Sequence, residues 1–442
     1  MKRDRQPDNT RVGLRAQDIQ TSTQDVELGP LSGEIKNVRL VGMAERLAIH
    51  IRGTEVIADY KRLAYVGSQF GIDALVLPQV LKVLEDLEWV RVEKRGASIV
   101  KVEESVPYFD DIYSAGGRYF RDSAPTEVEQ AAIEVSDILT SSPVPEIYVR
   151  EQLGLDDTTY AKVLDVGRSG KLIEQYTSPA DNETILYSPL YWIENPEKVK
   201  RMYELLKRHG ADEVHTALSK VRSYQGFPLL NEVLTTESSS SSAEIEIISE
   251  AIRRGIILAP EVDSFRGKRN FAFVPTVGLP VEEKIILEKA MAVLACIRYG
   301  QHFGSITKIH DPEAILNAVL RPPHRIGSHT EIRRQYAILV GRGMGRVFPD
   351  STQRERYFFE LIPTDENKRA VQLARDLLKV GEVIEGKGLS REAQGVLFYT
   401  GSYDEAIRTL PKLKKSPQLS LRTQEDLFRV LNDTMDQLRG AL

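Results

Sequence analysis

Four segments of this chain carry the same order of features: a helix-like stretch, a short apolar strand, a charged or polar loop, and a second apolar strand that stops at a proline. The closing prolines are Pro107, Pro189, Pro275 and Pro363, spaced 82, 86 and 88 residues apart. Self-similarity at a near-fixed period is typical of a chain built from repeated units. We therefore expect four small domains of one kind rather than one large core.

Helix, strand, loop and strand in this order resembles the second half of a winged helix-turn-helix domain. The resemblance is to this superfamily as a whole and covers roughly residues 34–364. It implies an α+β fold that is mostly α with small β wings. It also implies binding rather than catalysis, because tandem winged-helix proteins include transcription and DNA-maintenance factors, scaffolds of multi-subunit assemblies and RNA-binding arms. The superfamily does not identify the ligand.

The expected domains follow from the repeats and from the composition between them. They are a mobile N-terminal tail over 1–33, winged helices over 34–110, 123–192, 195–277 and 280–364, and a C-terminal helical segment over 365–442. The tail is predicted from its polar composition and its lack of apolar periodicity. The last segment reads as further helices that cap the array or join two chains.

Local signals place helix ends inside the repeats. Thr126 and Glu129 have the spacing of a capping box, and Pro78 suits the first turn of a helix. Gly154 is expected in the turn of a helix-turn-helix. The serine run at 238–242 is typical of a flexible linker, but the repeat alignment favours an enlarged turn between two helices.

Composition restricts the compartment and the chemistry. The chain of 442 residues has no apolar run of the ~18 residues that a membrane helix requires, and its first residues lack the apolar core of a signal peptide. Its one cysteine, Cys296, excludes an intrachain disulfide and is expected to be a buried thiol. We expect a cytoplasmic protein that contacts no membrane.

Charge is distributed unevenly along the chain. The formal net charge is −5 and the pI is about 6.0, which argues against a surface that binds nucleic acid everywhere. Between Arg321 and Tyr357, however, eight arginines face three acids, a net of +5. The rest of the chain therefore sums to −10, so any nucleic-acid contact is expected to be local.

Repeat four is the best candidate for that contact. Ser328 with Glu331 resembles a capping box, which predicts that the third helix begins here and carries its polar side chains into a groove. Arginine suits this role because its planar fork fits phosphates and guanine edges. The predicted contacts in repeat four are Arg325, Ser328, His329, Thr330, Arg333, Arg334, Gln335, Arg346, Arg354 and Arg356.

Repeat three offers a second set of cations. Arg254 lies near the end of its third helix, and Arg266, Lys268 and Arg269 lie in its wing, where aromatics alternate with cations. An arginine in the last turn also simply complements the helix dipole.

Repeats one and two have acidic third helices. Acids on these faces repel phosphates, so we expect repeats one and two to contact protein partners.

Motifs for catalysis are absent from the sequence. There is no P-loop, no HExxH, no paired CxxC and no GxSxG, and the glycines at 341–345 follow a helix where a dinucleotide loop would precede one. The seven histidines lack metal-ligand spacing. We predict no cofactor, no metal site and no catalytic residue.

The leading hypothesis is a non-enzymatic DNA-binding protein. It would hold duplex DNA through repeats four and three and bind proteins through repeats one and two. One alternative is a scaffold or adaptor of a DNA-maintenance or phage-defence assembly that uses winged helices for protein contact. The other is RNA binding through the same arginines.

Overall fold

The structure is a computed structural model of the 442-residue chain. It describes residues 7–58, 60–96, 98–107, 109–179, 181–192, 196–229, 241–264, 267–275, 281–304 and 308–381. The chain divides into two compact units. Unit one comprises 1–134, 156–170 and 387–442, and unit two comprises 135–155 and 171–386.

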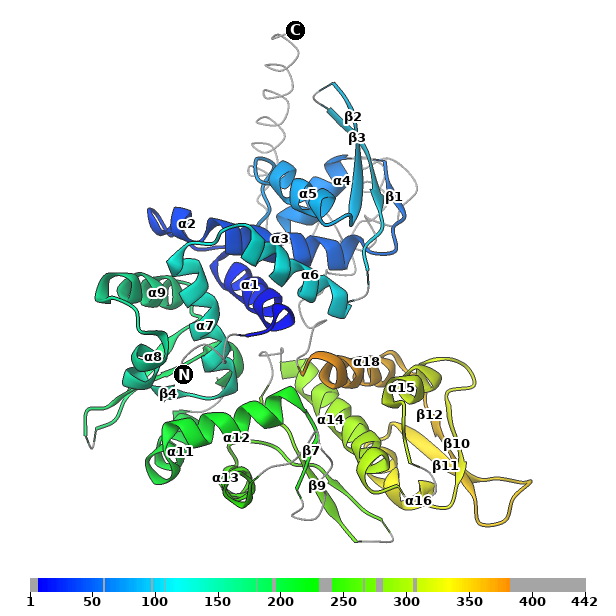
Figure 1. Ribbon diagram of the computed structural model, residues 1–442. Coiled ribbons are helices and arrows are strands. Elements are labelled where there is room, and N and C mark those ends of the chain that lie inside the picture. The colour runs from blue at the N-terminus through cyan, green and yellow to red at the C-terminus, as the bar shows by residue number, and fades with distance from the viewer. Residues whose placement is uncertain are drawn as a thin grey trace. The chain divides into compact units, whose positions relative to one another are not determined.

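The fold is α+β: helices make up most of it, and the strands form four small antiparallel sheets (Figure 1). In each sheet the first strand in sequence pairs with the third, and the third pairs with the second. The strands are β1 (Val56–Ile57), β2 (Val90–Arg95) and β3 (Ser98–Glu104); β4 (Val144–Pro145), β5 (Glu174–Thr177) and β6 (Thr184–Tyr187); β7 (Phe227–Pro228), β8 (Glu261–Val262) and β9 (Arg269–Ala272); β10 (Arg325–His329), β11 (Gly345–Pro349) and β12 (Tyr357–Leu361). One sheet thus falls in each predicted repeat, which confirms the α+β class.

Repeat one lies in unit one. It runs in the order α3 (Lys36–Ile51), β1, α4 (Tyr60–Ser68), α5 (Leu77–Asp86), β2 and β3. Pro78 is in the first turn of α5, as predicted, where its missing N–H has no helical partner to lose. The apolar face of α5 is buried against α3, so this repeat has its own core.

The N-terminal segment differs from the prediction. Residues expected to form a mobile tail form helix α1 (Asn9–Thr23), which packs against α3 and α6 (Phe109–Asp122) (Figure 1). Asp8 caps α1 by accepting a hydrogen bond from the Arg11 N–H at 2.9 Å. The prediction failed because α1 buries polar side chains and therefore shows no apolar stripe.

Two of those polar side chains, Gln17 and Gln20, are hydrogen-bonded to partners on neighbouring elements. The Arg46 guanidinium donates to Gln20 Oε1 at 2.9 Å, and the Tyr113 hydroxyl donates to Gln17 Oε1 at 2.9 Å. Burial lowers the pKa of Arg46 to about 10. A buried amide or guanidinium that keeps its hydrogen bonds avoids most of the desolvation penalty. Tertiary contacts thus allow a helix with a polar sequence to be buried in the core.

Repeat two begins with α7 (Glu127–Ser141). The predicted capping box is confirmed: the Glu129 N–H donates to Thr126 Oγ1 at 3.1 Å, and the Thr126 N–H donates to Glu129 Oε2 at 2.9 Å. Gly154 follows α8 (Glu146–Leu153) with φ of 63°, the left-handed turn that favours glycine, and α9 (Asp157–Ser169) comes next. The boundary between the two units passes through this repeat.

Repeat three lies in unit two. Two helices lead into it, α10 (Pro189–Trp192) and α11 (Pro196–His209), and it contains α12 (Ala211–Ser223) and α13 (Ser242–Arg253). From the serine run, Ser241 caps α13 in a capping box with Glu244. Residues 238–240 of the run, and most of the predicted second helix, lie outside the described residues.

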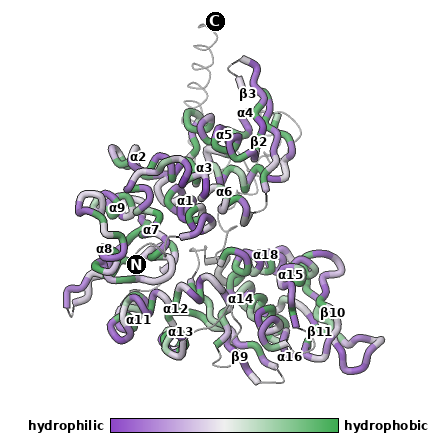
Figure 2. The backbone as a smooth tube through the Cα atoms, in the orientation of Figure 1, coloured by the Kyte–Doolittle hydropathy of each residue, from purple (hydrophilic) through white to green (hydrophobic). Residues whose placement is uncertain are grey.

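Repeat four is built around α14 (Val281–His302), whose residues 290–300 are all buried. The helices that follow α14 are α15 (Pro312–Leu320), α16 (Ile332–Gln335), α17 (Ala337–Gly341) and α18 (Asp365–Val380). The short helix α2 (Leu31–Glu34) belongs to unit one and not to this repeat. Figure 2 shows α14 as largely hydrophobic and the loop between β11 and β12 as hydrophilic. Beyond α18, residues 382–442 of the predicted C-terminal segment lie outside the described residues.

The predicted third helix of repeat four is wrong in its first half. The sequence predicted a helix from Ser328, but this residue lies in strand β10, and α16 starts at Ile332. Ile326 is buried and pairs with Phe359 of β12, which fixes this segment as extended chain. Among the described residues, no helix has the length and apolarity to cross a membrane.

Candidate nucleic-acid interface

The sheet of repeat four has two faces with different roles. Its inner face carries Ile326, Phe359 and Leu361, which belong to the core around α14. Side chains alternate between faces along a strand, so the residues between them point to the other side. That outer face carries Arg325, Arg346, Phe348, Phe358 and Glu360.

Glu360 links two arginines on the outer face. Arg325 Nε donates to Glu360 Oε2 at 2.6 Å, and Arg346 Nε donates to Glu360 Oε1 at 2.9 Å. These bonds hold the pKa of Glu360 below its usual range, with Arg325 making the larger contribution. The carboxylate is 14% exposed and the Arg346 side chain 71% exposed. Two arginines therefore share one carboxylate, which leaves the group with net positive charge.

Phe348 and Phe358 form a cross-strand pair beside these charges. Their ring centroids lie 5.5 Å apart with planes inclined by 22°, and the Arg325 guanidinium lies 4.7 Å from the Phe348 centroid. Both rings are partly exposed. An aromatic pair of this kind stabilises a hairpin by about 0.2–1 kcal/mol.

Helix α16 carries the next two arginines. Arg333 and Arg334 are exposed, and the Arg333 guanidinium lies 5.0 Å from the ring centroid of Tyr357. Arg334 Nη1 donates to the Ser264 carbonyl at 3.4 Å. These two predicted contacts therefore face solvent.

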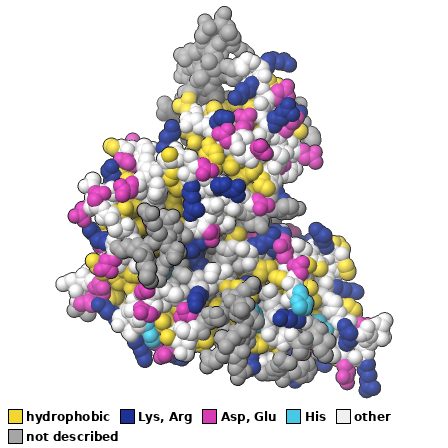
Figure 3. Space-filling model, in the orientation of Figure 1, with side chains coloured by type: hydrophobic (Ala, Val, Ile, Leu, Met, Phe, Trp, Pro, Cys, Tyr) yellow, Lys and Arg dark blue, Asp and Glu magenta, His cyan; other side chains and the backbone are white. Residues whose placement is uncertain are grey.

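The loop between β11 and β12 is organised by one acid. Asp350 accepts hydrogen bonds from Ser328 and Thr352, which lower its pKa to about 2. Arg356 Nε donates to the Ser328 carbonyl at 3.0 Å, and Arg354 is exposed. This hairpin projects from the rest of repeat four (Figure 1), and its basic side chains, which are all arginines, appear dark blue in Figure 3.

Three predicted contacts are placed differently from the expectation. Gln335 is 2% exposed, and its Nε2 donates to the Cys296 carbonyl at 2.8 Å, so it cannot read a base. His329 lies in β10, where burial and then the charge of Arg356 lower its pKa to about 4. Thr330 is exposed in the turn before α16. The expected recognition surface therefore reduces to Arg333 and Arg334.

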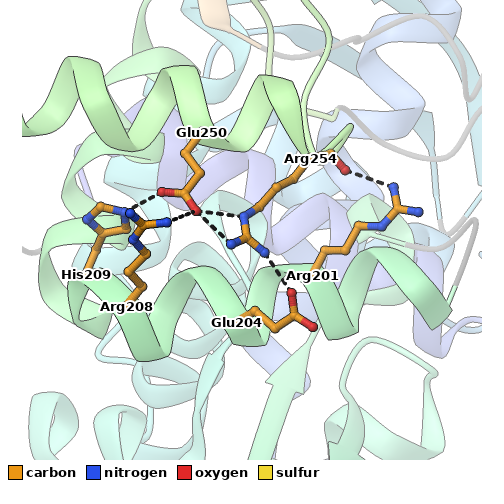
Figure 4. Close-up of polar contacts among 6 residues, drawn as sticks. All are labelled: Arg201, Glu204, Arg208, His209, Glu250 and Arg254. Atoms are coloured by element: carbon orange, nitrogen blue, oxygen red, sulfur yellow. Dashed lines mark hydrogen bonds and ion pairs between the residues drawn. The ribbon is translucent and has the colours of Figure 1, made fainter.

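Repeat three uses its helix-end arginine internally. Arg254 Nε donates to Glu250 Oε1 at 2.8 Å, and Arg254 Nη1 donates to Glu204 Oε2 at 2.7 Å (Figure 4). Arg208 and His209 reach the same Glu250 carboxylate from α11, at 3.1 and 2.8 Å. Arg254 is therefore used to link α13 to α11 through these two acids, and not to contact a ligand as predicted.

The wing cations of repeat three are also engaged. Lys268 pairs with Glu261 at 2.6 Å, although both are exposed. The Arg269 guanidinium lies 5.7 Å from the ring centroid of Phe303. Arg266 lies outside the described residues.

Surfaces in unit one carry the acidic character that the sequence predicted. On α5, Lys82 is paired with Asp86 at 2.6 Å. On α9, Lys162 is paired with Glu34 at 2.6 Å, while Asp157 and Asp165 are exposed.

In the part of the chain that the structure describes, no group of three histidines, cysteines or acids is arranged to hold a metal ion. Cys296 is buried in α14, and burial raises the pKa of its thiol. It donates to the Gln335 carbonyl at 3.1 Å.

Comparison with protein-family models, with curated proteins and with solved structures finds no match for this chain.

Strand β10 and the outer-face residues Phe348, Phe358 and Glu360 were not predicted from the sequence. A signal was present, because the stretch Arg346–Val347–Phe348 and the stretch Phe358–Phe359–Glu360 each alternate between the two faces. Without the register of the two strands, nothing indicated that the rings and charges share a face.

Proposed function

We propose that this chain is a nucleic-acid-binding protein made of four winged helices, and that repeat four contacts the phosphate backbone of duplex DNA. The observation that carries the proposal is the exposed arginine surface of repeat four. The chain is acidic as a whole, yet Arg333, Arg334 and Arg354 face solvent within one small domain. Arginine clusters of this kind bind phosphates through paired hydrogen bonds.

Four features of the strands support the winged-helix assignment. Each sheet has the same strand order, each is antiparallel, each second and third strand form a hairpin, and in repeats one to three the first strand follows a long helix. Repeat four departs from the others because its first strand, β10, follows α15, and only the short α16 and α17 separate β10 from the hairpin.

The short helices between β10 and the hairpin favour contact with the phosphate backbone of DNA over recognition of its bases. A helix that reads bases inserts several side chains along its length into the major groove. Helix α16 has 4 residues and α17 has 5, little more than one turn each. With Gln335 buried, we expect binding with little sequence preference and with strong salt dependence.

The test uses the full chain and a labelled duplex in fluorescence anisotropy. Replacing Arg333 and Arg334 with alanine is expected to weaken binding about tenfold, and to reduce the slope of log affinity against log salt by about 1–2. Arg168→Ala, on the acidic helix α9, is the matched control and should leave affinity unchanged. Equal affinity of the double variant and the wild-type chain would remove the assignment.

A scaffold role is the second candidate, because specific surfaces in unit one favour it. Asp157 and Asp165 are exposed on α9, and Leu75 is 73% exposed in the turn between α4 and α5. Acids that repel phosphate on repeat two, and an exposed apolar side chain on repeat one, both suit a protein partner. If all four repeats have this role, the wild-type chain and the Arg333/Arg334 variant will both fail to bind the duplex.

RNA is the remaining alternative ligand. Competition between duplex DNA and structured RNA for the labelled site distinguishes the two, because the phosphate contacts are shared while the helix geometry differs. Stronger competition by RNA would replace duplex DNA as the proposed ligand.

A further inference from the structure

We propose that the outer face of the β10–β12–β11 sheet binds unpaired nucleotides of a single-stranded nucleic acid. In this arrangement a base stacks on the Phe348–Phe358 pair, and a phosphate takes the place of Glu360 as the partner of Arg325 and Arg346. The inference rests on the proposed nucleic-acid binding, but it uses a different face of repeat four from Arg333 and Arg334.

The rings are placed on the solvent side by the strand register. Phe348 pairs with Phe358, whereas the next pair, Val347 with Phe359, lies on the core side. The two rings are stacked at 5.5 Å and remain partly exposed. A flat aromatic surface on a sheet offers a base the π-face that single-strand binding proteins use.

The arginines complement the charge of a nucleotide. Arg346 and Phe348 are two residues apart on β11, so their side chains leave the same face roughly 7 Å apart. From β10, the Arg325 guanidinium lies over the Phe348 ring, 4.7 Å from its centroid. Both arginines flank Glu360 in the row of side chains next to the ring pair, so a base on the rings would have two guanidiniums beside it to receive one phosphate.

Glu360 is the internal competitor for those phosphates. It accepts a hydrogen bond from Arg325 at 2.6 Å and one from Arg346 at 2.9 Å. Ion pairs whose arginines reach solvent are worth little on average, so a phosphate can displace the carboxylate. Removing the Glu360 charge is therefore expected to strengthen binding, an outcome that a purely structural hairpin would not give.

An unpaired base is required because the bases of a duplex are already stacked on their neighbours. Stacking on an aromatic residue needs a base that is free on at least one face. We therefore expect the outer face to distinguish single strands from duplex, while Arg333 and Arg334 govern the duplex.

The experiment measures the full chain by anisotropy with three probes: oligodeoxythymidine, oligouridine and a duplex. Phe348→Leu with Phe358→Leu keeps the apolar character of the hairpin and removes the rings. We expect this variant to bind single strands at least about tenfold more weakly, with duplex affinity changed less than about twofold. The two single-stranded probes show whether the ligand is DNA or RNA.

Glu360→Gln provides the second arm and does not depend on the fold of the leucine variant. We expect it to bind single strands several-fold more tightly, because the face gains one net positive charge. Wild-type single-strand affinity in the leucine variant, or no gain in Glu360→Gln, overturns the inference. If the chain binds the duplex but no single strand, the inference fails and the duplex proposal stands. If it binds single strands through the rings but does not bind the duplex, the duplex proposal fails and the inference stands.

Discussion

At the scale of single residues, the carboxylate of Glu250 shows how charge is used inside unit two. Its side chain is 5% exposed and is surrounded by Arg208, His209 and Arg254. The hydrogen bond from His209, followed by those from the arginines, lowers the pKa of Glu250 to about 2. Arg254 was predicted from sequence as a ligand contact because it lies near the end of the third helix of repeat three; the folded chain supplies partners that the sequence does not reveal.

Replacing Glu250 with glutamine is expected to destabilise unit two by about 1–3 kcal/mol, since the surrounding cations lose their anion. The measurement is the midpoint of denaturant unfolding. Glu246→Gln is the matched control, because Glu246 is exposed on the same helix. An equal effect of both substitutions would show that the cluster contributes nothing.

The same carboxylate makes a pH prediction. The folded pKa of Glu250 lies below its unfolded value, so the folded state binds fewer protons and is favoured at higher pH. The stabilisation is present above about pH 4.5 and is lost as the pH falls towards about 2. The free energy of unfolding, followed by circular dichroism, should therefore fall more between about pH 4.5 and 2 for the wild-type chain than for Glu250→Gln, which lacks that part of the pH dependence.

At the scale of elements, helix α1 depends on close approach to its neighbours. A Cβ at Gly42 of α3 would lie 2.4 Å from the Ala16 carbonyl oxygen of α1, and one at Gly117 of α6 would lie 1.9 Å from the Asn9 carbonyl oxygen. Backbone atoms cannot retreat as a flexible side chain can. The glycines therefore allow α1 to pack, and apolar periodicity could not have predicted this.

Gly42→Ala is accordingly expected to destabilise unit one by about 1–3 kcal/mol, despite the better helix propensity of alanine. Thermal unfolding measures the effect. Gly33→Ala is the control because a Cβ there meets nothing within 4 Å. If the two alanine variants melt alike, the close packing of α1 is not what stabilises this region.

Strand β10 illustrates the limit of capping signals. Ser328 and Glu331 have the spacing of a capping box, as Thr126 and Glu129 do, but only the second pair forms one. Burial of Ile326 beside Phe359 and pairing with β12 outweigh a cap that is typically worth about 1 kcal/mol. The capping-box pattern therefore marks a helix start at Thr126 but not at Ser328, where a long-range strand pairing competes.

At the scale of the whole molecule, charge is segregated along the chain. Repeat four carries a net of +5 between Arg321 and Tyr357 against −10 for the remainder. Ultraviolet cross-linking of the full chain to a duplex, followed by peptide mapping, should therefore give adducts in 321–361. Adducts confined to α5 or α9 would show that repeats one and two, and not repeat four, contact the DNA.

The sequence by itself determined the α+β class, the helix ends at Pro78, Thr126 and Gly154, and the concentration of arginine between Arg321 and Tyr357. These features depend on local periodicity, on turn chemistry and on composition, which each segment carries alone. Only the tertiary structure decided that α1 is a core helix, that Arg254 and Gln335 are engaged internally, and that β10 is a strand. It also brought Phe348, Phe358 and Glu360 onto one face, because strand register and the partners of buried polar groups arise from residues far apart in the chain.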